Sequence, residues 1–532
     1  TPLDTGLMLP HLHFENPSPR IRWDDFKIKV LTETKPLPPA KLSKDGKYIV
    51  SLSSFGFGGA NSHTVMERVP NTAQISDVTP LSANDPMLVA IGALSNRAVT
   101  SLSNSMTEAW ESETDPMHAA MLARTMTERA RGHPNMAFAV ATPSEPLSFS
   151  DTTATSTPDL NPIKAFVFCG QGPQHENMGR HLYVRFQAFR DSVNQSFSIV
   201  ERFHKKNFTQ EYGLFNPENE GHMKTTDTGS WTVEAIVIAI TIFQIALFDL
   251  WVDLGVKPDV VLGHSVGEIA AMYASGAFSH EKAIRTAIAR SNALGLLDTI
   301  DGSMAALGMS RAEAQELLDR IMKANNVTTG LWVSASNSVN AVSVSGETKL
   351  IEEVVRQCES AGIFARQLRV GGPYHSPMVS PCGEPFLREV YPVVDAEPNV
   401  PTTRFISTVE GRMHEEAQPL DAQYCWHNVC RPVLFRESIE VLHAYRKEQD
   451  RGLLIIEIAP HSVLGSYMDE ITQSVQGERT TILSCARRPN LKKGETKDMP
   501  VEITQFLTAV GTAMQAGERD LAVFKLYTDR YV

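Results

Sequence analysis

The sequence lacks the cysteine patterns that mark disulfide scaffolds, zinc modules and redox enzymes. Only six of its 532 residues are cysteine, and none forms a Cys-x-x-Cys pair. Cys425 and Cys430 stand five positions apart, a spacing that fits neither a zinc knuckle nor a redox motif. We therefore expect scattered reduced thiols, as in cytoplasmic proteins, and no metal site.

An excess of positive charge, a long hydrophobic run and a leader are also missing. The formal net charge of −12 is spread along the chain, which argues against nucleic acid or a membrane as the main partner. The most apolar stretch, residues 235–250, includes Thr241, Gln244 and Asp249, so we expect a buried core helix rather than a membrane span. The first residues do not resemble a secretory signal, and a cytoplasmic location is the expectation.

The chain does contain 42% apolar residues and enough length for three or four compact units. Hydrophobic patterning predicts a small α/β domain with strands at 87–91 and 136–141 around helices at 97–110 and 116–129. A second α/β pattern begins at residue 165. Within it, residues 302–370 predict a β-α-β-β-α-β insertion of the ferredoxin-like kind, with a hairpin turning around Asn337 and Ser338.

The most informative pattern in the chain lies at residues 258–274. A β-rich run leads into Gly263-His264-Ser265-Val266-Gly267, and a helical pattern follows. This is the layout of a nucleophile elbow, in which flanking glycines allow a sharp turn and the serine hydroxyl projects above the N-terminus of a helix. An ordinary Gly-rich turn is the alternative, but the strand before and the helix after favour a catalytic serine.

Three further segments could complete a site around Ser265. A strand runs into a Gly-Gln-Gly loop at residues 170–172, whose backbone could supply one N–H of an oxyanion hole. Among 16 histidines, His375 stands out, because two prolines rigidify its loop and because it follows the serine as the base does in α/β hydrolases. Arg290 lies on a mostly apolar helix, which indicates either a solvated face or a semi-buried guanidinium that needs a carboxylate or phosphate.

These segments occur together and in order with residues 426–428, Trp-His-Asn, and residues 432–435, Pro-Val-Leu-Phe. Jointly they resemble the malonyl-type acyltransferase domain of a multidomain, fungal-type iterative polyketide synthase. Residues 457–461 and 483–488 resemble the closing segments of that family. Residues 11–17 and 53–67 resemble the end of a ketosynthase.

The resemblance implies a role for each residue of the candidate site. Ser265 would be the acylated nucleophile and His375 its base. The backbone N–H groups of Gln171 and Val266 would form the oxyanion hole. The carbonyl of Asn428 would orient His375, which agrees with the lack of any aspartate in a triad context.

The resemblance also implies which residues bind substrate. Arg290 would hold the free carboxylate of the extender unit, and His264 would lie among the substrate-binding residues. Tyr374 is bulky, and in relatives a bulky residue before the histidine accompanies malonyl rather than methylmalonyl. Two departures concern the pocket: residues 237–238 read Val-Ile where many relatives have Gln-Pro, and the Gly-Gly pair at 371–372 is expected to widen or loosen the specificity loop.

The implied fold is α/β, with an α/β-hydrolase-like acyltransferase core, an inserted ferredoxin-like subdomain and a small α/β linker domain before them. The implied domains run in this order along the chain: a truncated, non-catalytic ketosynthase tail at 1–70, a ketosynthase–acyltransferase linker at 71–160, the large acyltransferase subdomain at 161–301 and 371–486, the small subdomain at 302–370, and a post-acyltransferase linker at 487–532.

The implied function is transfer of malonyl from malonyl-CoA to the phosphopantetheine thiol of an acyl carrier protein, through a serine ester, in polyketide biosynthesis. No bound cofactor is expected. The expected partners are malonyl-CoA, the acyl carrier protein and other synthase domains, notably the ketosynthase, with no nucleic acid or membrane. Two alternatives stay open: a serine esterase or thioesterase, and a non-catalytic scaffold that docks carrier protein.

Overall fold

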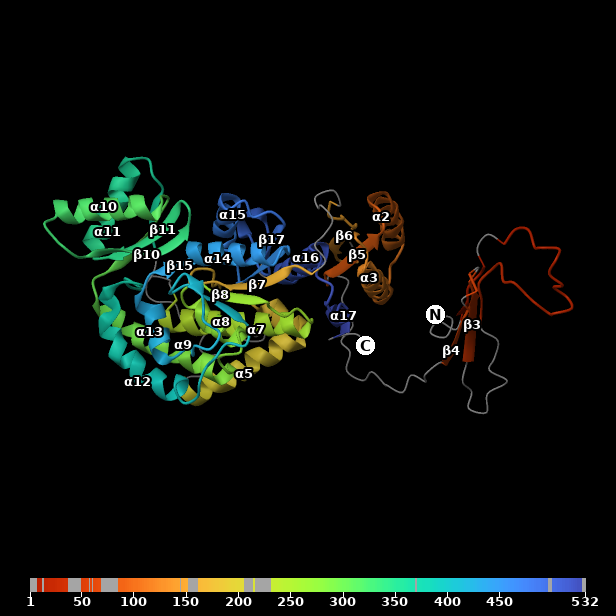
Figure 1. Cartoon of the computed structure of the whole chain (residues 1–532), viewed down its shortest axis with the longest axis horizontal. Helices are drawn as coiled ribbons and strands as arrows, with labels where there is room; N and C mark the ends of the chain where they lie inside the picture. Colours follow the sequence, from red (N-terminus) through yellow and green to blue (C-terminus); the bar gives the residue numbers. More distant parts are fainter. Residues whose placement is uncertain are drawn as a thin grey trace. The chain divides into compact units, whose positions relative to one another are not determined.

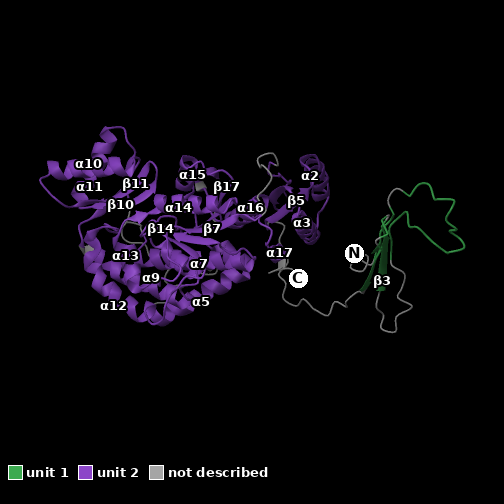
Figure 2. Ribbon diagram, in the orientation of Figure 1, with its two compact units in different colours: residues 1–77 green, residues 78–532 purple. Residues whose placement is uncertain are grey.

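The computed structural model describes the chain at 7–11, 14–36, 49–56, 58–59, 61–67, 85–143, 145–151, 161–204, 214–215, 231–368, 371–495 and 500–528. The chain divides into two compact units, residues 1–77 and residues 78–532 (Figure 2). Figure 1 labels the elements of both units.

The first unit contains two antiparallel strand pairs. The short strands β1 (Leu7–Met8) and β2 (Lys35–Pro36) form one pair, and β3 (Ile49–Phe55) and β4 (Asn61–Glu67) form the other. Gly59, with φ of 86°, lies in the turn before β4, so the Gly-rich turn leading into a strand is confirmed. Four residues of the two ketosynthase-like segments, Leu12, His13, Phe57 and Ala60, lie outside the described residues.

The second unit begins with the small α/β domain that the sequence predicts. Its two antiparallel strands and two helices are β5 (Met87–Ala93), α2 (Asn96–Glu111), α3 (Pro116–Ala130) and β6 (Asn135–Ala141). Two later helices pack on this domain: α16 (Val501–Gln515) contacts both strands, and α17 (Lys525–Thr528) contacts β5 and α3 through the Tyr527 hydroxyl. In α16 a Cβ at Gly511 would stand 2.4 Å from the Phe138 ring, so glycine allows the helix to approach β6 closely.

A six-stranded sheet in the order β14-β13-β8-β7-β16-β17 forms the centre of the large subdomain. Its strands are parallel except β14. Their bounds are β7 (Ile163–Phe168), β8 (Val260–Gly263), β13 (Arg404–Ser407), β14 (Arg412–Met413), β16 (Leu453–Ile458) and β17 (Thr480–Ser484). The inner strands are buried on both faces, which explains their continuous apolar sequences.

Alternate residues of these strands pack into two different hydrophobic clusters. Phe166 of β7 belongs to the cluster formed with α5, α7 and α9, whereas Ala165 belongs to the cluster formed with α14 and α15. Helices therefore cover both faces of the sheet (Figure 1). The helical segments of the large subdomain are α4 (Arg180–Arg185), α5 (Gln187–His204), α7 (Val233–Asp253), α8 (Gly267–Ala274), α9 (His280–Leu294), η1 (Gly295–Thr299), η2 (Pro377–Cys382), α12 (Gly383–Val394), α13 (Ala422–Cys430), α14 (Phe435–Glu448), α15 (Gly465–Ser474) and η3 (Leu491–Lys493).

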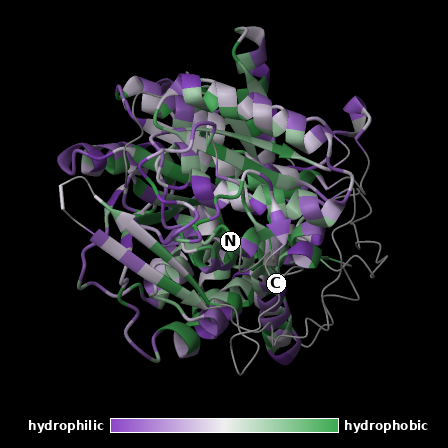
Figure 3. Cartoon of the chain, turned by 90° about the vertical axis from the view of Figure 1, so that its right-hand side faces the viewer, coloured by the Kyte–Doolittle hydropathy of each residue, from purple (hydrophilic) through white to green (hydrophobic). Residues whose placement is uncertain are grey.

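The apolar helix α7 is a core helix, as the sequence predicts. Among the described residues it is the one helix long and apolar enough to cross a membrane, but 83% of its apolar window is buried inside the protein. The Gln244 amide donates a 2.7 Å hydrogen bond to the Cys169 carbonyl, which anchors α7 at the end of β7. Other helices are amphipathic, and hydrophobic and hydrophilic residues alternate along their ribbons (Figure 3).

The small subdomain confirms the predicted ferredoxin-like insertion. Its elements are β9 (Ser303–Leu307), α10 (Arg311–Ala324), β10 (Leu331–Ser338), β11 (Ala341–Gly346), α11 (Thr348–Ser360) and β12 (Ala365–Gln367). They form an antiparallel sheet in the order β12-β9-β11-β10, to which β15 (Val433–Leu434) adds a parallel edge strand.

The predicted hairpin turn around Asn337 and Ser338 is wrong by two residues. Both residues belong to β10, and the turn falls at residues 339–340. Asn337 is a polar strand residue with a long-range contact. Its side-chain Oδ1 lies 2.9 Å from Nε2 of the His264 ring.

Candidate active site

Ser265 lies in a sharp turn between β8 and α8, as the elbow pattern predicts. Its φ is 55°, in the left-handed region that non-glycine residues rarely adopt. The turn requires both flanking glycines. A Cβ at Gly263 would lie 2.3 Å from the Glu268 backbone nitrogen, and a Cβ at Gly267 would lie 2.3 Å from the Phe168 carbonyl oxygen.

His375 is brought to Ser265 from the loop that follows the small subdomain. The Ser265 Oγ and His375 Nε2 atoms are 2.7 Å apart, and the two residues are only 7% and 5% exposed. His375 also has a left-handed backbone, with φ of 58°. Burial, aided by the nearby charge of Arg290, lowers the pKa of His375 to about 3, so its imidazole is neutral and can accept the serine proton.

The prediction that the Asn428 carbonyl orients His375 is wrong. The Nδ1 atom of His375 lies 3.0 Å from the Arg431 carbonyl oxygen instead. Arg431 is the first residue after α13 and has an extended backbone, which turns its carbonyl away from the helix, whereas Asn428 remains inside the last turn. A carbonyl can only accept, so Nδ1 carries the proton and Nε2 is the free acceptor facing Ser265.

Arg290, on α9, is the cation of the site and is more deeply buried than its sequence context suggests. It is 2% exposed; Nη1 donates to the side-chain oxygen of Asn428, and Nη2 lies 3.4 Å from Ser265 Oγ. Within the described parts of the chain, its Nε has no hydrogen-bond partner. The nearby carboxyl group of Glu268 is linked to it only through the Asn428 side chain. Burial lowers the pKa of Arg290 to about 10, which leaves the guanidinium charged at neutral pH. A buried cation without an anion is costly, and an incoming carboxylate would relieve that cost.

Gln171 and Val266 lie on the two segments that meet beside Ser265. The Gly-Gln-Gly loop packs directly on the elbow, because a Cβ at Gly170 would stand 2.9 Å from the His264 ring. Val266 precedes the first residue of α8. Neither backbone N–H donates to another residue that the structure describes, whereas the next amide of the loop, that of Gly172, donates to Gln174. Two N–H donors are thus left for a ligand.

Tyr374 and His264 directly precede His375 and Ser265 in the chain, and the His264 ring contacts Asn337 of the small subdomain. Tyr374 is buried, and its carbonyl accepts a 2.7 Å hydrogen bond from Ser345 of the small subdomain. The glycine pair before it, expected to widen or loosen the loop, instead lets the loop lie close to its neighbours. A Cβ at Gly371 would be 2.9 Å from the Val233 side chain, and one at Gly372 would be 2.9 Å from Leu297.

Sequence reasoning missed a functional candidate, Glu268. Its side chain is fully buried behind Ser265, on the first turn of α8, and contacts the Asn428 amide that also contacts Arg290. The sequence does contain a signal for it: Glu268 directly follows the elbow glycine, Gly267, and stands at the start of an otherwise apolar helix. Charged residues are rarely buried without a polar partner.

Comparison with known proteins places most of the chain in a family. The family described as "Acyl transferase domain" matches residues 165–518, more than half of the chain. The chain therefore belongs to the acyl transferase domain family. A second family, described as "Ketoacyl-synthetase C-terminal extension", matches residues 17–140.

The relatives of the chain are polyketide synthases. A highly reducing polyketide synthase of Strobilurus tenacellus is 29% identical over 97% of this chain and 17% of the relative, and a squalestatin hexaketide synthase of a Phoma species is 28% identical over 96% and 19%. The chain thus spans less than a fifth of either relative. Among solved structures, the acyltransferase domain from module 8 of the salinomycin polyketide synthase matches with a TM-score of 0.67 and 21% identity, over 84% of this chain and 98% of the other. At that identity the match shows the shared fold.

Proposed function

We propose that this acyltransferase moves a malonyl group from malonyl-CoA to the phosphopantetheine thiol of an acyl carrier protein, as one domain of a cytoplasmic polyketide synthase. One observation carries the proposal. A buried guanidinium, whose Nε has no hydrogen-bond partner among the described residues, lies 3.4 Å from the hydroxyl of a serine that is 2.7 Å from a neutral imidazole. A substrate with a thioester at one end and a carboxylate at the other satisfies both groups at once.

The first half of the reaction loads the enzyme. The His375 Nε2 atom takes the Ser265 proton while Oγ attacks the thioester carbonyl. The negative oxygen that forms is held by the Gln171 and Val266 N–H groups. The C–S bond then breaks, the CoA sulfur receives the proton from His375, and the malonyl group remains on Ser265 as an ester.

The second half of the reaction unloads the enzyme by the same route. The carrier-protein thiol gives its proton to His375 and attacks the ester carbonyl, and Ser265 leaves and recovers the proton. The His375–Arg431 contact keeps the ring in one tautomer throughout. The chemistry requires no resident cofactor, because malonyl-CoA brings the acyl group and the carrier protein brings the acceptor thiol. The ketosynthase would be the neighbouring domain that uses the product.

Transfer to a separately prepared acyl carrier protein tests this function. With labelled malonyl-CoA, we expect the label to appear on the carrier protein in preference to free malonate. Label released only as malonate would identify a thioesterase. No turnover of any kind would identify a scaffold.

His375→Ala should lower the rate of acyl transfer by roughly 10²–10⁴-fold, the usual contribution of a positioned base. Because the pKa of His375 is lowered to about 3, the base is neutral throughout the range from about pH 5 to 8, and transfer of an uncharged acetyl group should not vary with pH there. Rates of transfer by the two proteins across that range provide the measurement. His118→Ala, at an exposed side chain of α3, is the control. A His375→Ala rate near that of the control would point to His264 as the base.

Tyr374→Ser should narrow the preference for malonyl over methylmalonyl. The tight packing of the loop holds the tyrosine in place, and a single extra methyl group is discriminated by about 1–3 kcal/mol in such pockets. Competition between the two CoA esters, measured as the ratio of kcat/KM values, tests this. Equal values for both esters in the unmodified protein would remove the role given to Tyr374.

A further inference from the structure

Glu268 is surrounded by four hydrogen-bonding groups, and none of the contacts that the structure describes for its carboxyl group is with a cation. Its Oε1 atom lies 2.7 Å from the Thr408 backbone nitrogen and 2.8 Å from the Thr408 hydroxyl. Its Oε2 atom lies 3.0 Å from the Tyr424 hydroxyl and 2.9 Å from the Asn428 amide nitrogen. The carboxyl group is fully buried, so it has no contact with solvent and its hydrogen bonds come from these protein groups.

The number of protons around Thr408 favours a neutral carboxylic acid. The Thr408 hydroxyl lies 2.7 Å from the Gly263 carbonyl, which can only accept, and 2.8 Å from Glu268 Oε1. One hydroxyl proton cannot serve both contacts. If Glu268 carries a proton on Oε1, it donates to Thr408, which donates to Gly263, and both contacts become hydrogen bonds.

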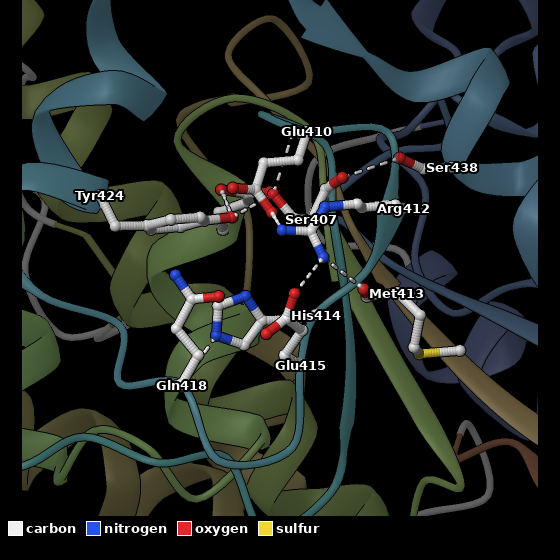
Figure 4. A network of polar contacts seen from close by, with 10 residues as sticks. Ser407, Glu410, Arg412, Met413, His414, Glu415, Gln418, Tyr424 and Ser438 are labelled. Atoms are coloured by element: carbon white, nitrogen blue, oxygen red, sulfur yellow. Dashed lines mark hydrogen bonds and ion pairs between the residues drawn. The ribbon is translucent and has the colours of Figure 1, made fainter.

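The other side of Glu268 agrees with this proton count. The Tyr424 hydroxyl also lies 2.7 Å from Ser407 Oγ, and that oxygen accepts a hydrogen bond from the Glu410 backbone N–H. Ser407 can therefore donate to Tyr424 (Figure 4). Tyr424 can in turn donate to Oε2 of Glu268. Oε2 needs no proton of its own.

The Asn428 side chain joins Glu268 to Arg290 in a fixed orientation. Arginine only donates, so the amide oxygen of Asn428 faces Arg290 and its NH₂ group faces Glu268. Glu268 thereby fixes the amide that holds the guanidinium beside Ser265, without itself touching the reacting atoms.

We propose that Glu268 is a positioning residue that acts as a neutral acid, with its proton on Oε1. It orients Asn428 and Arg290, and, because it is uncharged, it leaves the positive charge of Arg290 available to the carboxylate of the substrate. The consequence for substrate binding rests on the proposed malonyl transfer, whereas the protonation of Glu268 does not.

The electrostatic surroundings support this assignment. Burial raises the pKa of Glu268 to about 7. The groups that face it are Tyr424 and Cys425 on α13, both with raised pKa values, and Arg290 on α9, with Glu410 beyond Tyr424. Below about pH 7 the acid is neutral; above it, the carboxylate attracts the guanidinium and competes with the substrate.

This predicts a selective pH dependence of substrate binding. From about pH 6 to 9 the KM for malonyl-CoA should rise roughly tenfold, as expected when a nearby charge opposes binding at an effective dielectric constant near 20. The kcat value and the KM for acetyl-CoA should stay level. Acetyl-CoA carries the same CoA phosphates, so it corrects for their titration.

Glu268→Gln should remove the pH dependence of the malonyl KM. In the proposed state, one atom of Glu268, Oε1, accepts from the Thr408 N–H and donates to the Thr408 hydroxyl. No single atom of a glutamine side chain can do both, so this variant should also unfold at a lower temperature. Glu410→Gln is the matched control, because Glu410 belongs to the same network but pairs with Arg412. It should keep the pH dependence of the unmodified protein. A Glu268→Gln profile that still rises with pH would overturn the proposal.

Infrared spectroscopy of the unmodified protein tests the proton without any substrate. The difference between spectra at about pH 6 and 9 should contain a C=O band of a buried protonated carboxyl group, and this band should persist in Glu410→Gln. Burial also raises the pKa of Glu502 to about 7, so Glu502 contributes a band of its own. If Glu268→Gln folds, its band should therefore be weaker than that of the unmodified protein, and a band of equal strength would overturn the proposal. Absence of the band from the unmodified protein would overturn the proposal even if malonyl transfer were established. Presence of the band with no malonyl transfer would instead count against the proposed function.

Discussion

Arg290→Ala is expected to lower kcat/KM for malonyl-CoA by roughly 10²–10³-fold while changing acetyl-CoA transfer little. The guanidinium is 2% exposed, its Nη1 donates to the neutral Asn428 side chain, and its Nε has no partner among the described residues, so the substrate carboxylate would be its charge partner. Removing one member of a buried charge pair costs about 2–5 kcal/mol, or roughly 30- to 4,000-fold, and the expected loss lies inside this range. An acetyl group makes no such pair, and its transfer should be largely preserved.

The comparison between the two CoA esters is the decisive part of this experiment. Arg290→Lys keeps the charge but presents fewer donors, so it should lie between the unmodified protein and the alanine variant for malonyl transfer. Equal losses for malonyl and acetyl would show that Arg290 supports the fold of the site and does not select a carboxylate. Thermal unfolding of each variant separates these effects from loss of structure.

Ser265→Ala should reduce acyl transfer by roughly 10⁴-fold or more, because no other group can form the ester. The variant should remain folded. Alanine has no larger side chain to fit into the turn, and the lost Ser265–His375 hydrogen bond contributes only about 1 kcal/mol. Transfer of labelled malonyl to carrier protein, together with the unfolding temperature, provides the measurement.

Ser291→Ala is the matched control for that variant. Ser291 is a buried serine on α9, next to Arg290, and its hydroxyl donates only to the Ile288 carbonyl of its own helix. It should transfer malonyl at close to the normal rate. If Ser265→Ala matched this control, another nucleophile would have to carry the reaction.

The parts of the site that could be predicted from the sequence are those fixed by local backbone geometry. The elbow is an example, because the steric need for Gly263 and Gly267 arises within a few residues of the turn. The order of elements in the small subdomain is another, since hydrophobic periodicity and turns indicate strands and helices directly. The buried character of α7 likewise follows from its composition.

The parts that could not be predicted depend on contacts between distant segments. Glu268 and Asn428 are 160 residues apart, and nothing in either local pattern indicates that they meet. The carbonyl that faces His375 is set by where α13 ends, and helix ends are placed less reliably than helices. The turn after β10 is misplaced because of another long-range contact. Asn337 belongs to the strand, and its side chain contacts His264, far away in the sequence.

The most direct test of the account is the intact mass of the unmodified protein after brief exposure to malonyl-CoA, without carrier protein. The account predicts a gain of one malonyl group per chain. After proteolysis the group should be found on the peptide that contains Ser265, and adding carrier protein should remove it. No mass gain, or a malonyl group attached to any other residue, would contradict acyl transfer through Ser265.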